Sequence, residues 1–217
     1  MVAIIDYGVG NLFSLRSSFA AIGQEAAVTR DIGEIRRADR MVLPGVGAFQ
    51  DAAEKLRGSG MAQAVKEEAQ KGKPLLGVCL GMQMLFERSY EYGVHEGLGL
   101  LKGEIRPIAE RIPAGLKIPQ MGWNALKIVR SSPLLRNTRE GDHVYFVHSY
   151  SAVGCEDSLL AVTEYGAELT ACVGKGNVFG CQFHPEKSGD VGLRILKAFC
   201  EMEMGEVSSQ YASVSCD

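Results

Sequence analysis

The first half of the chain alternates short apolar runs with longer amphipathic stretches. The apolar runs predict strands buried on both faces, and they occupy residues 2–5, 26–29, 40–43 and 75–78. In the amphipathic stretches apolar residues recur at three-and-four spacing, which predicts helices over residues 12–22, 49–56 and 61–70. Strands that alternate with helices in this way favour a parallel sheet with helices on both faces.

The second half of the chain is richer in strands. Residues 143–150 alternate apolar and polar positions, as a half-buried strand does. Further strand-like runs occupy residues 159–164, 169–173 and 178–183. Glycine-containing turns join these runs, so we expect an added strand region on one edge of the sheet. A final helix is expected over residues 190–202, with Ser188 as its cap.

These patterns predict the α/β fold class: a mostly parallel sheet flanked by helices, with an added antiparallel strand region. No internal repeat or linker divides the chain, so residues 1–204 are expected to form a single domain. Residues 205–217 are rich in serine and show no periodicity, and we expect this tail to be disordered.

The stretch from residue 75 to residue 86 places a cysteine at a sharp change of pattern. A buried strand ends at Val78, helical spacing begins at Met82, and Cys79 lies between them with a glycine two positions away on either side. α/β-Hydrolases hold a serine nucleophile at such a strand-to-helix elbow. The N-terminus of the helix would favour a Cys79 thiolate, which is a nucleophile. The alternative is that Cys79 is a small buried hydrophobic residue, the commonest role of a free cysteine.

A cysteine nucleophile needs a base, and one of the four histidines stands out. His184 ends a strand-like run and is followed by Pro185, which fixes the backbone, and by Glu186. Glu186 could hold one imidazole nitrogen of His184 while the other nitrogen faces the cysteine. Two alternatives remain open: His184 could be a strand-end histidine bonded to the backbone, and His148 could be the base instead.

Composition narrows the function classes. The 217 residues are 46% hydrophobic and 23% charged, which is typical of a globular protein. A net charge of −3 without a basic block argues against nucleic-acid binding. No apolar run could span a membrane and no signal peptide is evident, so we expect a cytoplasmic protein. The six cysteines lack Cys-x-x-Cys spacing, which predicts reduced thiols, with Cys172 and Cys181 in the core.

The motif GVCLGMQ at residues 77–83, followed by FHPEKS at residues 183–188, resembles the class I, or triad-type, glutamine amidotransferases. The resemblance covers almost the whole chain apart from its tail. It implies that Cys79, His184 and Glu186 form a catalytic triad that hydrolyses glutamine to glutamate and ammonia. No cofactor or metal is expected.

Thiolate attack on an amide creates an oxyanion, which needs aimed N–H donors. Leu80, directly after the nucleophile, can supply one donor. The resemblance places the other donors at Val46 and Gly47, in the glycine-rich loop after the third strand. A peptide of this loop could flip when a partner or ligand arrives. For glutamine binding, the resemblance implies Gly45, Gln83, Ser149 and Tyr150.

Two further motifs, DYGVGN at residues 6–11 and PQMGWN at residues 119–124, are similar to the glutaminase subunits of histidine biosynthesis. That similarity implies a separate TIM-barrel cyclase subunit as partner, which would use the ammonia to form imidazole glycerol phosphate and AICAR. The partner-facing residues that the resemblance implies are Asn11, Arg16, Trp123, Asn124, Tyr145 and Lys187.

Several alternatives compete with these assignments. Asn11 could be a helix cap, Arg16 a solvated charge and Trp123 a core residue. Anthranilate and aminodeoxychorismate subunits typically carry histidine at the position of Met82, which disfavours them. A non-catalytic protein that kept the fold is disfavoured by the intact triad, and a stand-alone hydrolase would be active without a partner.

Overall fold

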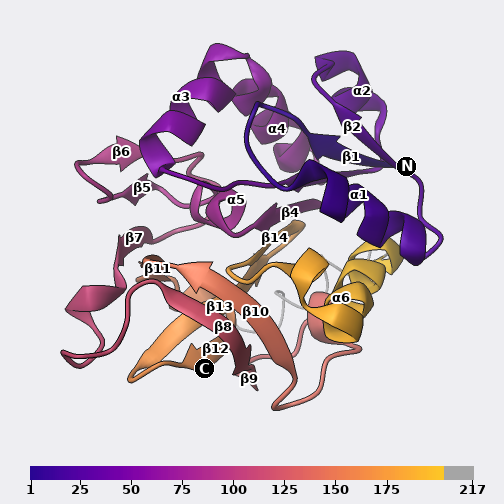
Figure 1. The fold of residues 1–217 in the computed structure, drawn as a ribbon. Coiled ribbons are helices and arrows are strands. Elements are labelled where there is room, and N and C mark those ends of the chain that lie inside the picture. Colours follow the sequence, from indigo (N-terminus) through magenta and orange to yellow (C-terminus); the bar gives the residue numbers. More distant parts are fainter. Residues whose placement is uncertain (203–217) are drawn as a thin grey trace, which may run out of the picture.

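The computed structural model describes residues 1–202, and Figure 1 shows their arrangement. Eight strands form the largest sheet, and in chain order they are β1 (Val2–Ile5), β2 (Ala26–Thr29), β3 (Arg40–Leu43), β4 (Leu75–Val78), β9 (Lys127–Ile128), β12 (Leu159–Glu164), β13 (Glu168–Lys175) and β14 (Val178–Cys181). Their order in space is β2-β1-β3-β4-β14-β13-β12-β9.

The sheet changes character at β14. Strands β2, β1, β3, β4 and β14 run parallel to one another, whereas β13, β12 and β9 continue the sheet with antiparallel pairing. The predicted fold class, a mostly parallel sheet with an added antiparallel region, is confirmed. Because β14 pairs directly with β4, it brings a distant part of the chain beside the predicted nucleophile strand.

Helices cover both faces of the parallel strands (Figure 1). Their bounds are α1 (Leu12–Ala21), α2 (Ile32–Arg37), α3 (Phe49–Gly58), α4 (Met61–Gln70) and α6 (Gly189–Glu201). Helices α2, α3 and α4 lie together on one side of the sheet, and α1 packs with α6 on the other side. The predicted helices over residues 12–22, 49–56, 61–70 and 190–202 are confirmed to within a few residues.

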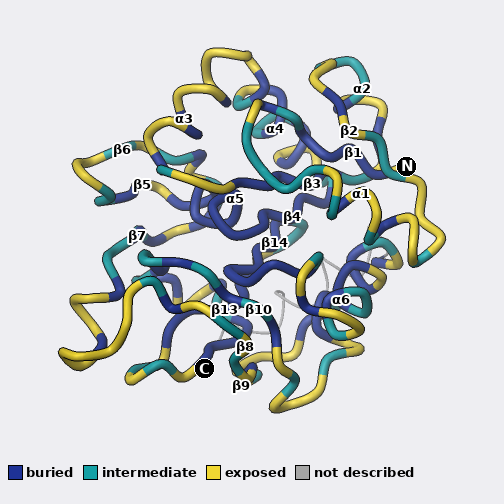
Figure 2. Tube along the Cα trace, viewed as in Figure 1, coloured by how far each residue is buried: buried dark blue, intermediate teal, exposed yellow. Residues whose placement is uncertain are grey.

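Successive strand residues face opposite sides of the sheet and so enter different hydrophobic clusters. Ile5 and Leu43 pack with residues of α2, α3 and α4. Ile4 and Val42, their neighbours along the chain, pack instead with residues of α1 and α6. The inner parallel strands β1, β3, β4 and β14 are therefore buried on both faces, as their apolar runs predict, and Figure 2 shows them in dark blue at the centre. The same prediction is wrong for β2, an edge strand whose residues are mostly intermediate or exposed.

Two smaller sheets stand beside the large one. The first pairs β8 (Gln120–Ala125) with β10 (His143–His148), and the second joins β5 (Arg88–Ser89), β6 (His95–Glu96), β7 (Glu104–Pro107) and β11 (Tyr150–Val153). Strand β10 buries alternate residues, which confirms the half-buried strand predicted there as far as His148. The predicted continuation to Tyr150 is wrong, because Tyr150 begins β11 in the other small sheet. Short 3₁₀ turns are η1 (Ile108–Glu110), η2 (Pro133–Leu135), η3 (Glu156–Ser158) and η4 (Pro185–Lys187).

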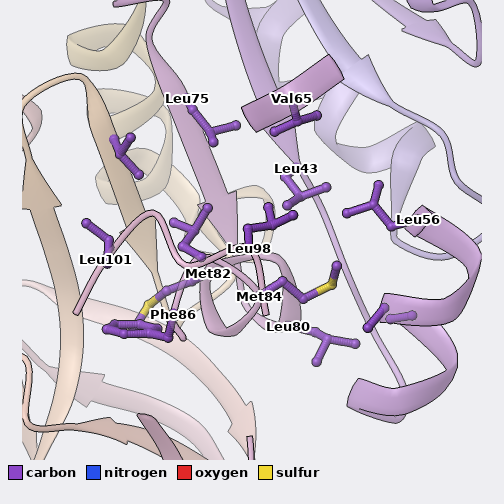
Figure 3. Packing of buried hydrophobic residues seen from close by; sticks show 14 of the residues in the cluster. Leu43, Leu56, Val65, Leu75, Leu80, Met82, Met84, Phe86, Leu98 and Leu101 are labelled. Atoms are coloured by element: carbon purple, nitrogen blue, oxygen red, sulfur yellow. The ribbon is translucent and has the colours of Figure 1, made fainter. Parts of the chain in front are cut away.

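The helix expected after Cys79 is much shorter than its apolar spacing predicts. Helix α5 (Leu80–Gln83) is a single turn. A longer helix would use the carbonyl groups of Met84 and Leu85, but residues 98–101 fold back and bond to them instead. The N–H of Leu98 donates to the carbonyl of Met84, and the N–H of Leu101 donates to the carbonyl of Leu85. Figure 3 shows Met84, Phe86, Leu98 and Leu101 in the core around this turn. A helix N-terminus does follow Cys79 directly, but a single turn contributes a smaller dipole than a long helix would.

Two other local predictions differ from the structure. Helix α2 was not expected, since its short charged sequence shows little periodicity, yet Asp31 caps it by accepting hydrogen bonds from Gly33 and Glu34. Ser188 does precede α6, but its hydroxyl makes no capping hydrogen bond. That hydroxyl donates instead to the carbonyl of His184, at 2.6 Å.

Among residues 1–202, no helix is long and apolar enough to cross a membrane. Cys172 and Cys181 are fully buried, which confirms their predicted place in the core. The expected tail at residues 205–217 lies outside the described residues. That residues 1–204 form a single domain stays a prediction.

Candidate active site

Three neighbouring parallel strands end at one edge of the sheet and bring the candidate residues together. Strand β4 lies between β3 and β14, with Gly77 opposite both Leu43 and Gly180. The glycine-rich loop follows β3, Cys79 follows β4 and His184 follows β14. Because the carboxyl ends of parallel strands share an edge, segments that are far apart in sequence converge there.

Cys79 occupies a strained elbow. Its φ of 55° and ψ of −112° lie in a region that side chains rarely adopt, at a cost of about 1–3 kcal/mol. The backbone is held there by the N–H of Cys79, which donates to the carbonyl of Cys181 at 2.7 Å. A Cβ atom at Gly81 would lie 1.8 Å from the carbonyl oxygen of Leu43, so no side chain fits at that position. The glycine thus lets the elbow press against β3.

His184 and Glu186 form a buried pair. The Nδ1 atom of His184 lies 2.8 Å from Oε1 of Glu186, and the two side chains are 3% and 1% exposed. The N–H of His184 donates to the carbonyl of Tyr145 at 2.9 Å. Ser188 braces the same turn, since its hydroxyl donates to His184 and accepts from the N–H of Tyr145. The imidazole is thereby fixed in position, with Nε2 left for Cys79.

The surroundings of His184 favour its protonated form. Burial alone would lower the pKa of the imidazole, but hydrogen bonds with Cys79 and Glu186 outweigh burial and raise that pKa to about 9. A protonated His184 near neutral pH places a positive charge beside the Cys79 sulfur. Such a neighbour favours a thiolate.

His148, the alternative base, lies in a different environment. Its Nδ1 donates to the carbonyl of Tyr150 at 2.8 Å, and its Nε2 lies 3.0 Å from the side-chain amide of Gln120. Burial lowers the pKa of His148 to about 4. Both nitrogens are engaged, and among residues 1–202 no carboxylate is hydrogen-bonded to the ring, so the geometry favours His184 as the base.

A cavity of about 520 Å³ opens in front of Cys79. Of the residues expected to bind glutamine or its oxyanion, six line the cavity: Val46, Gly47, Leu80, Gln83, Ser149 and Tyr150. Gly45 is not in that lining. A Cβ atom at Gly45 would lie 2.8 Å from the backbone nitrogen of Gly81, so its lack of a side chain serves close packing of the loop.

Glu91 is a cavity residue that sequence reasoning missed. Its Oε2 accepts a hydrogen bond from the N–H of Phe49 at 2.6 Å, and burial raises the pKa of its carboxyl. Tyr92, beside it, also lines the cavity. Both residues lie in a loop without periodicity, and a carboxylate in such a loop carries no sequence signal that separates it from a solvated one.

The loop after β3 is anchored at its first residue. The buried hydroxyl of Tyr7 donates to the carbonyl of Pro44 at 2.6 Å, and burial raises the pKa of this phenol, so it remains a donor. Beyond that anchor, Val46 is 43% exposed and Gly47 has a φ of 92°. The loop thus reaches the cavity in a conformation that glycine permits.

Three of the predicted partner-facing residues form a continuous group. Trp123 is 61% exposed, which shows that the core interpretation of this residue is wrong. The ring of Trp123 packs edge-on against the ring of Tyr145, with 4.8 Å between the two centroids. The Nζ atom of Lys187 lies over the Tyr145 ring, 5.5 Å from its centroid. Tyr145 also lies 6.5 Å from the imidazole of His184. Asn124 follows Trp123 in β8. Asn11 directly precedes α1, and Arg16 is an exposed residue of α1.

The family model for class-I glutamine amidotransferases matches residues 3–202. This chain therefore belongs to the class-I glutamine amidotransferase family. Among its relatives, the imidazole glycerol phosphate synthase subunit HisH of Lactococcus lactis subsp. lactis is 50% identical, over 92% of this chain and 98% of the relative. The subunit HisH of Wolinella succinogenes is 51% identical, over 93% of this chain and 100% of the relative.

Solved structures share the fold at lower identity. A crystal structure of a glutamine amidotransferase superposes with a TM-score of 0.71 at 20% identity, and it covers 92% of this chain and 98% of that chain. PurLQS from Thermotoga maritima superposes with a TM-score of 0.69 at 20% identity, over 92% of this chain and 96% of that chain. At these identities the likeness concerns the fold alone.

Proposed function

We propose that this chain is the glutaminase subunit of an imidazole glycerol phosphate synthase. It hydrolyses glutamine and delivers the ammonia to a separate cyclase subunit in histidine biosynthesis. One observation carries the proposal: Cys79 and the His184–Glu186 pair meet at adjacent strand ends in front of a cavity. The identity of about half of all residues with HisH proteins supports the choice of pathway.

The reaction begins with attack of the Cys79 thiolate on the side-chain amide carbon of glutamine. The oxyanion that forms is stabilised by the N–H of Leu80, which opens the turn α5 and has no partner within it, and by the loop at Val46 and Gly47. Protonated His184 gives its proton to the leaving ammonia, and a thioester remains on Cys79. His184 then accepts a proton from water, which hydrolyses the thioester to glutamate.

Glutamine is held at its amino-acid end by Ser149 and Tyr150, which line the cavity. The amide nitrogen of Gln83 already donates both to the carbonyl of Tyr150 and to Gln182. Its remaining oxygen can only accept a hydrogen bond, which suits the α-ammonium group of the substrate. The carboxyl of Glu91, in the same cavity, suits that group as well.

Free ammonia at neutral pH is mostly protonated and is then not a nucleophile, so the product needs a sheltered route to its acceptor. The partner is a TIM-barrel cyclase subunit that uses ammonia to form imidazole glycerol phosphate and AICAR in the cytoplasm. The group of Trp123, Tyr145 and Lys187 is the proposed contact, because it is surface-exposed at Trp123 and adjoins His184. Asn11, Arg16 and Asn124 complete the proposed interface.

The substitution Cys79→Ala tests the nucleophile in the complex with the cyclase subunit. We expect product formation from glutamine to fall by about 10³-fold or more, because no covalent intermediate can form. Formation of the same product from added ammonium salts should stay near the wild-type rate. Loss of both activities, or survival of the glutamine-driven one, would contradict the assignment.

A further inference from the structure

Gln182 is a fully buried amide that touches the candidate nucleophile. It lies between Cys181, the last residue of β14, and the turn that carries His184, and its backbone N–H donates to the carbonyl of Ala171 at 2.9 Å. Its side chain is 0% exposed. The Nε2 atom of Gln182 lies 3.8 Å from the sulfur of Cys79, within hydrogen-bonding range for sulfur.

The direction of this hydrogen bond follows from its neighbours. A backbone carbonyl can only accept, so the group that bonds the Tyr150 carbonyl at 3.1 Å must be the amide nitrogen of Gln83. The same nitrogen lies 3.0 Å from Gln182, which must therefore present its oxygen there. The NH₂ group of Gln182 then has to face the sulfur. The orientation of both amides is thus set by one carbonyl.

We propose that Gln182 is a further catalytic residue, whose side-chain amide donates a hydrogen bond to the sulfur of Cys79 and stabilises the thiolate. A thiolate accepts a hydrogen bond far better than a thiol does, so the contact favours the ionised nucleophile. The short turn α5 provides little dipole support, and Gln182 supplies a donor in its place. This inference rests on the proposed role of Cys79 as nucleophile.

The ionisable groups around the sulfur are few. His184 faces Cys79 from the end of β14, and Tyr7 lies near it from the loop after β1. Glu186 acts through His184, and Glu91 lines the same cavity. Gln182 does not titrate, so its replacement by methionine changes the ionisation of Cys79 without adding or removing a titrating group.

The substitution Gln182→Met keeps the size of the side chain and removes the donor. The rate of alkylation of Cys79 by iodoacetamide, followed by peptide mass spectrometry as a function of pH, reports the thiolate fraction without requiring turnover. We expect the midpoint of this profile to rise by about one pH unit, since a charge-assisted hydrogen bond is lost. Gln182→Glu keeps the bond from Gln83 but presents an acidic oxygen to the sulfur, and it should raise the midpoint further.

The matched control is Thr163→Val, which removes a hydrogen bond of 3.0 Å from a fully buried side chain in β12. We expect it to leave the alkylation profile of Cys79 unchanged, even where it lowers the melting temperature. If Gln182→Met does not fold, Gln182→Leu removes the same donor without adding a charge and gives the same comparison. A third variant, Gln83→Met, removes the donor that orients the amide of Gln182. It should raise the midpoint of the Cys79 alkylation profile by less than Gln182→Met does.

An unchanged alkylation midpoint in folded Gln182 variants would overturn the role of Gln182 and leave the nucleophile assignment intact. A purely structural role predicts that outcome, with a lower melting temperature only. Glutamine-driven activity in the Cys79→Ala complex would instead overturn the proposed function. The two failures are therefore seen in different experiments.

Discussion

Two buried histidines, at the ends of β14 and β10, lie close to the same cavity and yet have opposite properties. His184 is 2% exposed and His148 is 5% exposed, so both rings are withdrawn from water. The pKa of His184 is raised to about 9 and the pKa of His148 is lowered to about 4. Burial by itself therefore does not decide which histidine holds a proton.

The difference lies in the groups that face each ring. Burial lowers both pKa values, but His184 lies beside the carboxylate of Glu186 and the sulfur of Cys79, and these contacts outweigh burial. Burial is the main reason why the pKa of His148 is low, and the nearby charge of His184 lowers it further. The hydrogen-bond partners of the His148 ring are a backbone carbonyl and a side-chain amide, which do not balance a positive charge. The ring of His184 can therefore exchange protons with Cys79. The ring of His148 instead joins β8 and β11 through its hydrogen bonds with Gln120 and Tyr150.

The largest difference between the two histidines is expected when each imidazole is removed in turn. We expect His184→Gln to lower the rate of glutamine hydrolysis by about 10³-fold, because the general acid and base is lost. His148→Gln should lower it by less than about tenfold, since only the positioning of Tyr150 is disturbed. The measurement is kcat for glutamine in the complex with the cyclase subunit.

Equal losses in the two histidine variants would contradict the comparison. Ammonia-driven synthesis in both variants serves as the control for folding and for docking to the partner. A larger loss with His148→Gln than with His184→Gln would reassign the base.

The substitution Glu186→Gln removes the charge that distinguishes the two sites while keeping the shape of the side chain. We expect kcat to fall by about 10²-fold or more, because the imidazolium form of His184 is no longer stabilised. The pKa of His184, followed by NMR of the ring protons, should fall, although the contact with Cys79 remains. A variant with an unchanged His184 pKa would show that Glu186 is a packing residue.

The two histidines should also give opposite slopes of stability against pH. Folded His184 keeps its proton up to about pH 9, whereas an ordinary imidazole loses it near 6.5. The folded state therefore holds the His184 proton more tightly, and the contribution of the Glu186 contact to stability, complete below pH 6.5, is lost as the pH rises to 9. Urea unfolding from pH 6.5 to 9.5 measures this slope, and His184→Gln should flatten it.

On the acid side the sign reverses. Unfolded His148 takes up a proton near pH 6.5, but the folded ring resists it until about pH 4. Stability that is complete above pH 6.5 is lost as the pH falls to 4, by about 3 kcal/mol. His148→Gln should flatten this acid limb and leave the alkaline limb of the wild type in place. A variant that flattens both limbs would mean that the rings are not independent.

Much of the fold could be predicted from the sequence because its signals are local. The strand at Leu75–Val78 is an unbroken apolar run, and α4 repeats its apolar positions regularly. The sequence of helix α2 also carries a local signal, since Asp31 and Glu34 stand at capping-box spacing. The length of α5 had no such signal, because the returning residues around Leu98 end that helix by taking its carbonyl groups.

The residues of the candidate site also differ in whether a local sequence signal reveals them. Cys79, His184 and Glu186 could be proposed from glycines, a proline and a two-residue spacing, which are written in the local sequence. The role of Gln182 could not be predicted in this way, because it depends on a contact with Gln83, which lies 99 positions away in the chain. Strand pairing between β4 and β14 makes that contact, and no single stretch of sequence contains it.

The most direct test is to look for the covalent intermediate itself. The wild-type chain, in complex with the cyclase subunit and its nucleotide ligand, is mixed with glutamine, quenched in acid and mapped by peptide mass spectrometry. We predict the added mass of one γ-glutamyl group on the peptide that contains Cys79. Continued turnover of glutamine with no such adduct, or with the adduct on another cysteine, would contradict the account.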